Sequence, residues 1–180
     1  MAVRQRLSVE EYLALPEEKP YLEYENGEVV QKVAPDIRHM RLADELQFRL
    51  RLYRMEHGGD SGPEARVEFR VPGGKVFRLP DVSYWAAGRP MEGGQAMLPP
   101  TLTAEIRSPG QSMEDLGERC RFFRSHGVDV CWLIDPDTRT IESYEGDGAA
   151  QTLREEDTLV SQALPGFELP VKELFAALDR

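Results

Sequence analysis

The sequence predicts an α/β protein in which a mixed central sheet is flanked by helices. Three observations indicate this class. A helical pattern over residues 38–57 precedes three extended segments, and a second helical pattern over 113–126 precedes one more. That last segment, 129–135, is apolar almost throughout, which is typical of a central strand covered on both faces. This order of elements favours a mixed sheet with helices on its faces.

The composition fits one domain that spans residues 1–180. Hydrophobic residues make up 41% of the chain and charged residues 30%, an ordinary globular balance. No apolar run approaches the roughly 20 residues that span a bilayer. The short basic segment 1–7 lacks the apolar stretch of a secretory signal. We therefore expect a cytoplasmic protein that does not enter a membrane.

The net charge of −10 argues against a protein that binds nucleic acid passively, since contacts with phosphate supply most of that affinity. The negative net charge does not exclude an enzyme that acts on nucleic acid. A carboxylate-rich site attracts phosphate once it has bound divalent cations. Arginines also gather in two segments, 38–54 and 119–124, so local charge differs from the net charge.

Elements before residue 60 begin with signals of capping and turn formation. Ser8 followed by Glu11 is a capping box, and Asn26-Gly27 between two extended segments is a strong hairpin signal. Apolar residues then recur every three or four positions from Leu42 to Tyr53, which predicts an amphipathic helix. The predicted elements are a helix over 9–15, strands over 21–24 and 28–33, and a helix over 38–57.

Elements after residue 60 are mostly extended. A turn at 72–75 joins two strands as a hairpin, Ser112 with Asp115 caps a helix, and Gly127 ends it. Residues 86–100, rich in Gly and Pro, read as a loop. The predicted elements are a strand over 65–71, a strand over 76–79 that continues as extended chain over 81–85, a strand over 101–107, a helix over 113–126, strands over 129–135 and 140–144, and a last helix over 170–177.

A carboxylate and a guanidinium share one face of the predicted strand 101–107. Side chains alternate along a strand, so Glu105 and Arg107 point the same way, roughly 7 Å apart along the backbone. Asp81 starts or crosses a strand that should neighbour this one, and two such carboxylates can share one hard cation. The alternative is that Glu105 and Arg107 form an ion pair on a solvated strand face.

A cation held by Asp81 and Glu105 would suit phosphoryl chemistry. It can polarise a phosphoryl oxygen and lower the pKa of a bound water. Arg107, a bidentate donor, would stabilise charge on the transferring phosphate. Because it shares a strand face with Glu105, we expect its side chain to point toward the metal.

Pro80-Asp81 followed by Glu105-Ile106-Arg107 resembles the PD…(D/E)xK signature of the restriction-endonuclease-like superfamily. More closely, the chain from about Leu7 to Phe175 resembles the Uma family of putative restriction endonucleases. The matching stretches include Leu7-Ser8-Val9-Glu10-Glu11-Tyr12-Leu13, Asn26-Gly27-Glu28, Leu79-Pro80-Asp81-Val82-Ser83, Trp132-Leu133-Ile134-Asp135-Pro136 and Leu164-Pro165-Gly166-Phe167.

The resemblance implies a restriction-endonuclease-like αβββαβ core, with an N-terminal helix and hairpin and a C-terminal hairpin and helix. It implies Asp81 and Glu105 as metal ligands and Glu23 as a third acid, though Glu23 can equally be an ion-pair residue of its hairpin. Family members often carry a lysine on the helix after the acidic strand, and Arg119 occupies that position here. His39 lies on the apolar side of its helix, and we interpret it as a packed structural residue.

The chain departs from the pattern at both lysine positions, which hold Arg107 and Arg119. Arginine stays protonated and cannot take up a proton as a base. It can still orient water or stabilise a pentavalent transition state, so we expect both arginines to contact phosphate. The departure bears on the rate and on proton transfer more than on metal binding.

Together these features predict a Mg²⁺- or Mn²⁺-dependent endonuclease that hydrolyses phosphodiester bonds of DNA by attack of water at phosphorus. A homodimer would supply the two sites that cleavage of a duplex needs. Two alternatives stay open: a catalytically silent member that serves as a binding or assembly module, and a phosphohydrolase for a small nucleotide. The predicted catalytic residues are Asp81, Glu105, Arg107, Arg119 and Glu23.

Overall fold

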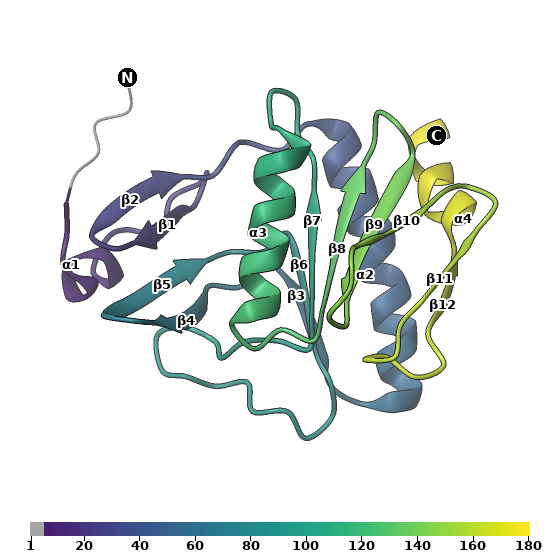
Figure 1. Cartoon of the computed structure of the whole chain (residues 1–180). Helices are drawn as coiled ribbons and strands as arrows, with labels where there is room; N and C mark the ends of the chain where they lie inside the picture. The colour runs from purple at the N-terminus through teal and green to yellow at the C-terminus, as the bar shows by residue number, and fades with distance from the viewer. Residues whose placement is uncertain (1–5) are drawn as a thin grey trace.

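The structure, a computed structural model, describes residues 6–180. In this range α2 (Ile37–His57) covers one face of a six-stranded central sheet and α3 (Met113–Ser125) covers the other, with a four-stranded side sheet beside them (Figure 1). The strand order of the central sheet is β10-β9-β8-β7-β6-β3. Its strands are β3 (Asp60–Pro63), β6 (Val82–Trp85), β7 (Leu102–Ile106), β8 (Val130–Asp135), β9 (Thr140–Glu145) and β10 (Gln151–Leu153).

The order α2, β3, β6, β7, α3, β8 confirms the predicted αβββαβ core. β7 and β8 are parallel and α3 connects them, whereas β3, β6 and β7 pair in antiparallel fashion. The first core strand is β3 and not the predicted strand 65–71, which lies in the side sheet. β3 was not predicted, because its residues Asp60–Pro63 have the composition of a turn. They form a strand by pairing with β6, from Asp60 opposite Trp85 to Pro63 opposite Val82.

The side sheet joins the predicted N-terminal hairpin to the hairpin of residues 67–78, in the order β2-β1-β5-β4. α1 packs on it through Tyr12, whose ring centroid lies 5.2 Å from that of Tyr24 and 5.4 Å from that of Phe77. Asn26 and Gly27 have φ angles of 51° and 89°, the positive values that a tight hairpin turn requires. The elements are α1 (Val9–Leu13), β1 (Leu22–Glu25), β2 (Glu28–Gln31), β4 (Val67–Val71) and β5 (Gly74–Arg78).

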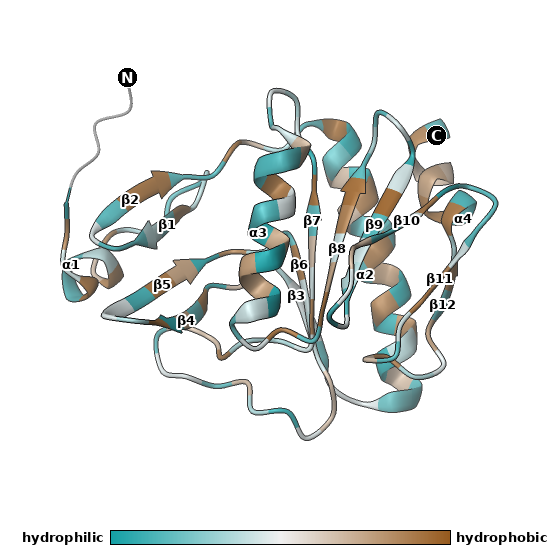
Figure 2. Cartoon of the chain, in the orientation of Figure 1, coloured by the Kyte–Doolittle hydropathy of each residue, from teal (hydrophilic) through white to brown (hydrophobic). Residues whose placement is uncertain are grey.

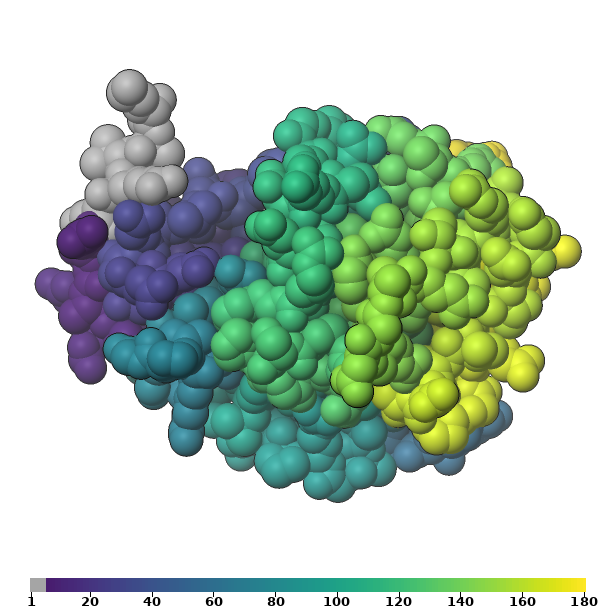
Figure 3. All heavy atoms as spheres, in the orientation of Figure 1, coloured from purple at the N-terminus to yellow at the C-terminus, as the bar shows by residue number. Residues whose placement is uncertain are grey.

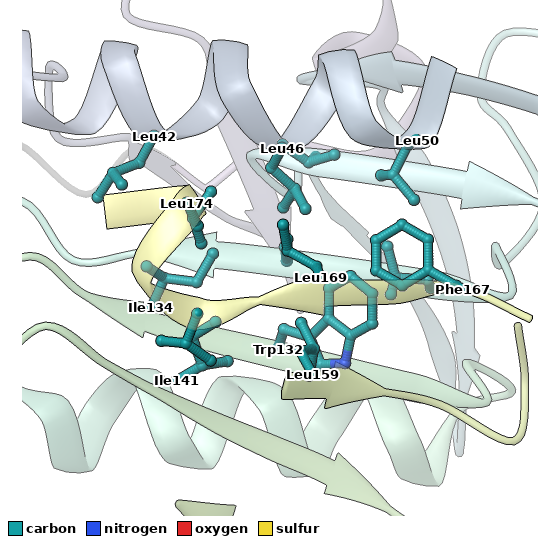
Figure 4. Packing of buried hydrophobic residues seen from close by; sticks show 14 of the residues in the cluster. Leu42, Leu46, Leu50, Trp132, Ile134, Ile141, Leu159, Phe167, Leu169 and Leu174 are labelled. Carbon is teal, nitrogen blue, oxygen red and sulfur yellow. The ribbon is translucent and has the colours of Figure 1, made fainter. Parts of the chain in front are cut away.

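The largest hydrophobic core lies between α2 and the central sheet. Leu42, Leu46 and Leu50 point from α2 toward apolar side chains of the sheet and of the C-terminal segment (Figure 4). Every residue of β8 is buried, which confirms the prediction of a central strand covered on both faces. A second core, with Phe123 and Leu133, lies between α3 and the sheet, and the outer side of α3 is mostly hydrophilic (Figure 2).

Ile134→Ala should lower the free energy of unfolding by about 2–5 kcal/mol. Ile134 is completely buried in β8 and packs in the core under α2, so the substitution leaves a cavity. Urea unfolding would measure the change. A loss well below about 1 kcal/mol would contradict the packing described for β8.

The C-terminal segment closes the core under α2. β11 (Thr158–Val160) and β12 (Glu168–Pro170) form a hairpin whose strands the residue pattern did not mark, in addition to the predicted hairpin of β8 and β9. α4 (Val171–Phe175) and a 3₁₀ turn (Ala176–Asp179) follow where the last helix was predicted. In Figure 3 the N-terminal hairpin lies on one side of α3 and this segment on the other. None of the helices in residues 6–180 combines the length and apolar character that crossing a bilayer requires.

Candidate active site

Asp81 and Glu105 lie side by side because β6 and β7 pair in antiparallel fashion. The register joins Val82 with Ala104, so the next position places Asp81 opposite Glu105. Oδ2 of Asp81 accepts a hydrogen bond of 2.8 Å from the backbone N–H of Ile106. The two acidic residues are only 6% and 3% exposed. The strand pairing thus buries two carboxylates next to each other.

Asp81 has a cationic partner and a histidine partner. Nζ of Lys32 lies 2.8 Å from Oδ1 of Asp81, and Nε2 of His39 lies 2.9 Å from Oδ2. Burial on its own would raise the pKa of Asp81. The positive charge of Lys32 and the hydrogen bond from His39 outweigh burial and hold the pKa well below its usual range. Asp81 is therefore an anion at neutral pH.

Glu105 is held more loosely than Asp81. Nε of Arg119 lies 3.0 Å from Oε1 of Glu105, but within residues 6–180 neither atom has an aligned hydrogen-bond partner. Burial raises the pKa of Glu105 to about 7, against the opposing charge of Arg119 and with added repulsion from Asp81. Glu105 therefore exchanges its proton near neutral pH, unlike its neighbour.

Arg119 ties α3 to the side sheet through Glu23. Its guanidinium donates two hydrogen bonds to the Glu23 carboxylate, of 2.7 and 2.5 Å, and Glu23 also accepts one of 2.7 Å from the backbone N–H of Leu79. Burial opposes ionisation of Glu23, but the charge of Arg119 outweighs it and lowers the pKa of Glu23. Glu23 thus belongs to the same cluster as Glu105, and its partner is on α3 rather than in its own hairpin.

A cavity of about 170 Å³ connects these groups. It lies where the N-terminal hairpin meets the central sheet and the first turns of α2 and α3. Lys32, Asp81 and Glu105 are among its lining residues, and Ser108 and Gln111 line it as well. The candidate functional residues that line the cavity come from the N-terminal hairpin, α2, the start of β6, β7 and α3. They are Glu23, Lys32, His39, Asp81, Glu105 and Arg119.

The expectation that Arg107 points toward the Asp81–Glu105 pair is wrong. β7 ends at Ile106, so the alternation of side chains does not continue to residue 107. The guanidinium turns toward other acceptors: it lies 3.2 Å from Asp135 and 2.8 Å from Asp137, and it donates to the carbonyl of Gln111 at 3.0 Å. Arg119, on the helix, is the arginine that contacts Glu105.

Lys32 and His39 are site residues that the sequence did not reveal as such. Lys32 directly follows β2, and its backbone N–H donates to the carbonyl of Tyr21, which prolongs the pairing of the hairpin. From this position its side chain reaches Asp81. The available signal was a single lysine in the mostly apolar stretch 29–34. His39 was interpreted as a packed structural residue, but its ring contacts Asp81 from the first turn of α2, where Asp36 caps the helix.

The residues present fit a hard divalent cation. Asp81 and Glu105 offer oxygen ligands from adjacent strands, which suits Mg²⁺ or Mn²⁺. Oε1 of Glu105 is buried without an aligned hydrogen bond, so a cation would satisfy an atom that the described residues leave unsatisfied. No group of three or more His, Cys, Asp or Glu side chains in residues 6–180 forms a ready metal cluster. The fit therefore depends on these two carboxylates.

Glu105→Gln should flatten the pH dependence of stability of the metal-free protein. The folded pKa of Glu105, about 7, lies above its usual value of 4.5, so the folded state holds a proton that the unfolded state releases. This contribution is fully present below pH 4.5 and is lost as the pH rises through about 7. Thermal melts in EDTA between pH 5 and 8 measure it.

Glu118→Gln, an exposed change on α3, is the matched control and should keep the profile of the unmodified chain. Parallel profiles for Glu105→Gln and the unmodified chain would show that Glu105 has an ordinary pKa.

Comparison with known proteins shows the family of the chain. A family model described as "Putative restriction endonuclease", Uma2, matches residues 9–172. Among solved structures, a putative nuclease belonging to DUF820 from Anabaena variabilis is similar to this chain, with 26% identity and a TM-score of 0.81, over 96% of this chain and 99% of that one. No curated protein matches the sequence. The chain belongs to the Uma2 family of putative restriction endonucleases.

Proposed function

We propose that the chain is a nuclease that hydrolyses phosphodiester bonds of DNA with a divalent cation, Mg²⁺ or Mn²⁺. The observation that carries this proposal is the buried pair Asp81 and Glu105 on adjacent strands, with Lys32 and Arg119 against it. The family of the chain and the similar putative nuclease support the reaction class.

In this proposal Asp81 and Glu105 hold the cation. When bound, it supplies Lewis acidity toward a phosphoryl oxygen and lowers the pKa of water. The surrounding protein orients the two carboxylates. The N–H of Ile106 and the ring of His39 fix Asp81, and Arg119 positions Glu105 while Glu23 anchors the guanidinium.

We assign to Lys32 the role that the lysine of the PD…(D/E)xK signature has. A lysine ammonium has three donors, and the described residues use two of them, on Asp81 at 2.8 Å and on the carbonyl of Leu79 at 2.7 Å. The third can donate to a phosphate oxygen in the cavity. The charges of Asp81 and Glu105 outweigh burial and raise the pKa of Lys32, so it is a cation at neutral pH.

Arg107 and Arg38 are suited to a phosphate next to the scissile one. Both pair with Asp137, beyond the end of β8, and Arg107 also bonds the backbone of Gln111, which lines the cavity. Guanidinium groups hold phosphates bidentately. We therefore place the path of the DNA backbone across this edge of the sheet, where phosphate would compete with Asp137 for the two guanidinium groups.

Cleavage of supercoiled plasmid tests the proposal. We expect nicked and linear products in Mn²⁺ or Mg²⁺, and none in EDTA or with Glu105→Gln. Glu118→Gln, purified in the same way, should cleave like the unmodified chain. Intact plasmid in both metals would contradict the proposal. Release of phosphate from mononucleotides in place of plasmid cleavage would favour a small-nucleotide phosphohydrolase.

One observation favours a second candidate, a catalytically silent module for binding or assembly. Both oxygens of Asp81 already accept hydrogen bonds from the protein, and Arg119 faces Glu105, so the internal cations balance the two acids without a metal. A silent module would bind neither Mn²⁺ nor Mg²⁺. Titration of the unmodified chain with each ion therefore separates the two functions.

A further inference from the structure

α2 has an apolar stripe on its outer side as well as on its inner side. Five of the eight large apolar side chains that are exposed in residues 6–180 belong to this one helix, with exposures of 47–77%. At 100° per residue they lie opposite the buried stripe of Leu42, Leu46 and Leu50. Such a concentration marks an interaction surface, since single exposed apolar residues are normally scattered. The outer stripe consists of Ile37, Met40, Phe48, Leu52 and Met55.

Two opposite charges interrupt the outer stripe. Asp44 and Arg51 are exposed, two turns apart on the same side, and no ion pair of either is found among the described residues. Other arginines of α2, by contrast, have acidic partners within the chain: Arg38 with Asp137, Arg49 with Glu45 and Glu173, and Arg54 with Asp60. Arg41 is half-buried and turns to the carbonyl of Leu178 at 3.5 Å, so Asp44 and Arg51 are the exposed charges of the stripe that are left for an external partner.

An antiparallel copy of α2 satisfies both charges at once. With a two-fold axis between residues 47 and 48, Asp44 lies opposite Arg51 of the second copy, and the same pair forms again on the other side of the axis. This register also sets Met40 opposite Met55 of the second copy and leaves Phe48 near the axis. Closed two-fold interfaces are self-complementary in this manner, and antiparallel helices pack through such stripes.

We infer that the outer face of α2 binds a second copy of this chain and forms a two-fold homodimer. The inference rests on the apolar stripe and its charge register and is independent of the proposed function. His39 lies on the inner side of the same helix, so the candidate active sites stay free of the interface.

Sedimentation equilibrium of the full chain tests the inference. We expect a dimer for the unmodified chain at micromolar concentration and a monomer for Phe48→Glu and for Met55→Glu. Val160→Glu is the matched control, because Val160 is equally exposed on β11, away from the stripe, and should leave the dimer intact. A monomeric unmodified chain at about 100 µM would overturn the inference.

Charge reversal tests the register. Asp44→Arg and Arg51→Asp should each raise the dissociation constant at least about tenfold, because like charges then face each other. The double variant Asp44→Arg/Arg51→Asp should restore the dimer. All these side chains are exposed, so thermal melts should show that the variants stay folded. Failure of the double variant to dimerise would overturn the antiparallel register. None of these measurements depends on cleavage or metal binding.

Discussion

Asp81→Asn should reduce plasmid cleavage on the order of a thousandfold and weaken Mn²⁺ binding. The substitution removes one of the two anionic ligands from a site that depends on both. It also leaves the Lys32 ammonium without its anion, so the free energy of unfolding should fall by about 1–3 kcal/mol. Cleavage assays and calorimetry measure the first effects, and urea unfolding measures the last.

Thermal melts with and without Mn²⁺ give an independent reading of the same variant. A cation that binds only the folded state raises the melting temperature of the unmodified chain. Asp81→Asn should lose most of that rise. An unchanged rise in the variant would remove Asp81 from the metal site.

Lys32→Ala should reduce cleavage on the order of a hundredfold while metal affinity increases. The ammonium donates to Asp81, so its loss removes a donor for phosphate and also a positive charge that competes with the metal. Mn²⁺ should therefore stabilise Lys32→Ala more than it stabilises the unmodified chain. The combined loss of activity and gain in metal binding distinguishes this role from a merely structural one.

Arg107→Ala is the matched comparison for Lys32→Ala. Arg107 lies outside the Asp81–Glu105 pair, and we expect a loss of less than about tenfold. The strand pattern had instead suggested that Arg107 points toward the metal and contacts the transferring phosphate. Full cleavage by Lys32→Ala, together with a large loss in Arg107→Ala, would mean that the guanidinium supplies the phosphate contact and that Lys32 is only a counter-ion of Asp81.

The parts of the fold that the sequence predicted well depend on local signals. Asn26-Gly27 sets its hairpin through its own backbone angles, and the capping box at Ser8 forms as predicted. The apolar run of β8 requires burial on both faces whatever its neighbours are. β3 was missed because its strand character comes only from pairing with β6.

The candidate site divides in the same manner. Asp81 and Glu105 could be placed on neighbouring strands because the motif and the alternation of side chains are local. Lys32 and His39 reach Asp81 only because the side sheet and α2 pack next to the start of β6, a non-local arrangement. Arg107 was misplaced because the strand ends one residue earlier, where Asp135 of β8 attracts the guanidinium.

Isothermal titration of the metal-free chain with Mn²⁺ measures directly whether Asp81 and Glu105 together hold a divalent cation. We expect one binding site per chain, lost in Glu105→Gln and strongly weakened in Asp81→Asn, with Glu118→Gln unchanged. Binding should also tighten as the pH rises from 6 to 8, because the cation competes with the proton of Glu105, whose pKa is about 7. Two results would contradict a metal site at Asp81 and Glu105. One is the absence of any heat of binding in the unmodified chain, and the other is Mn²⁺ affinity in Glu105→Gln and Asp81→Asn equal to that of the unmodified chain.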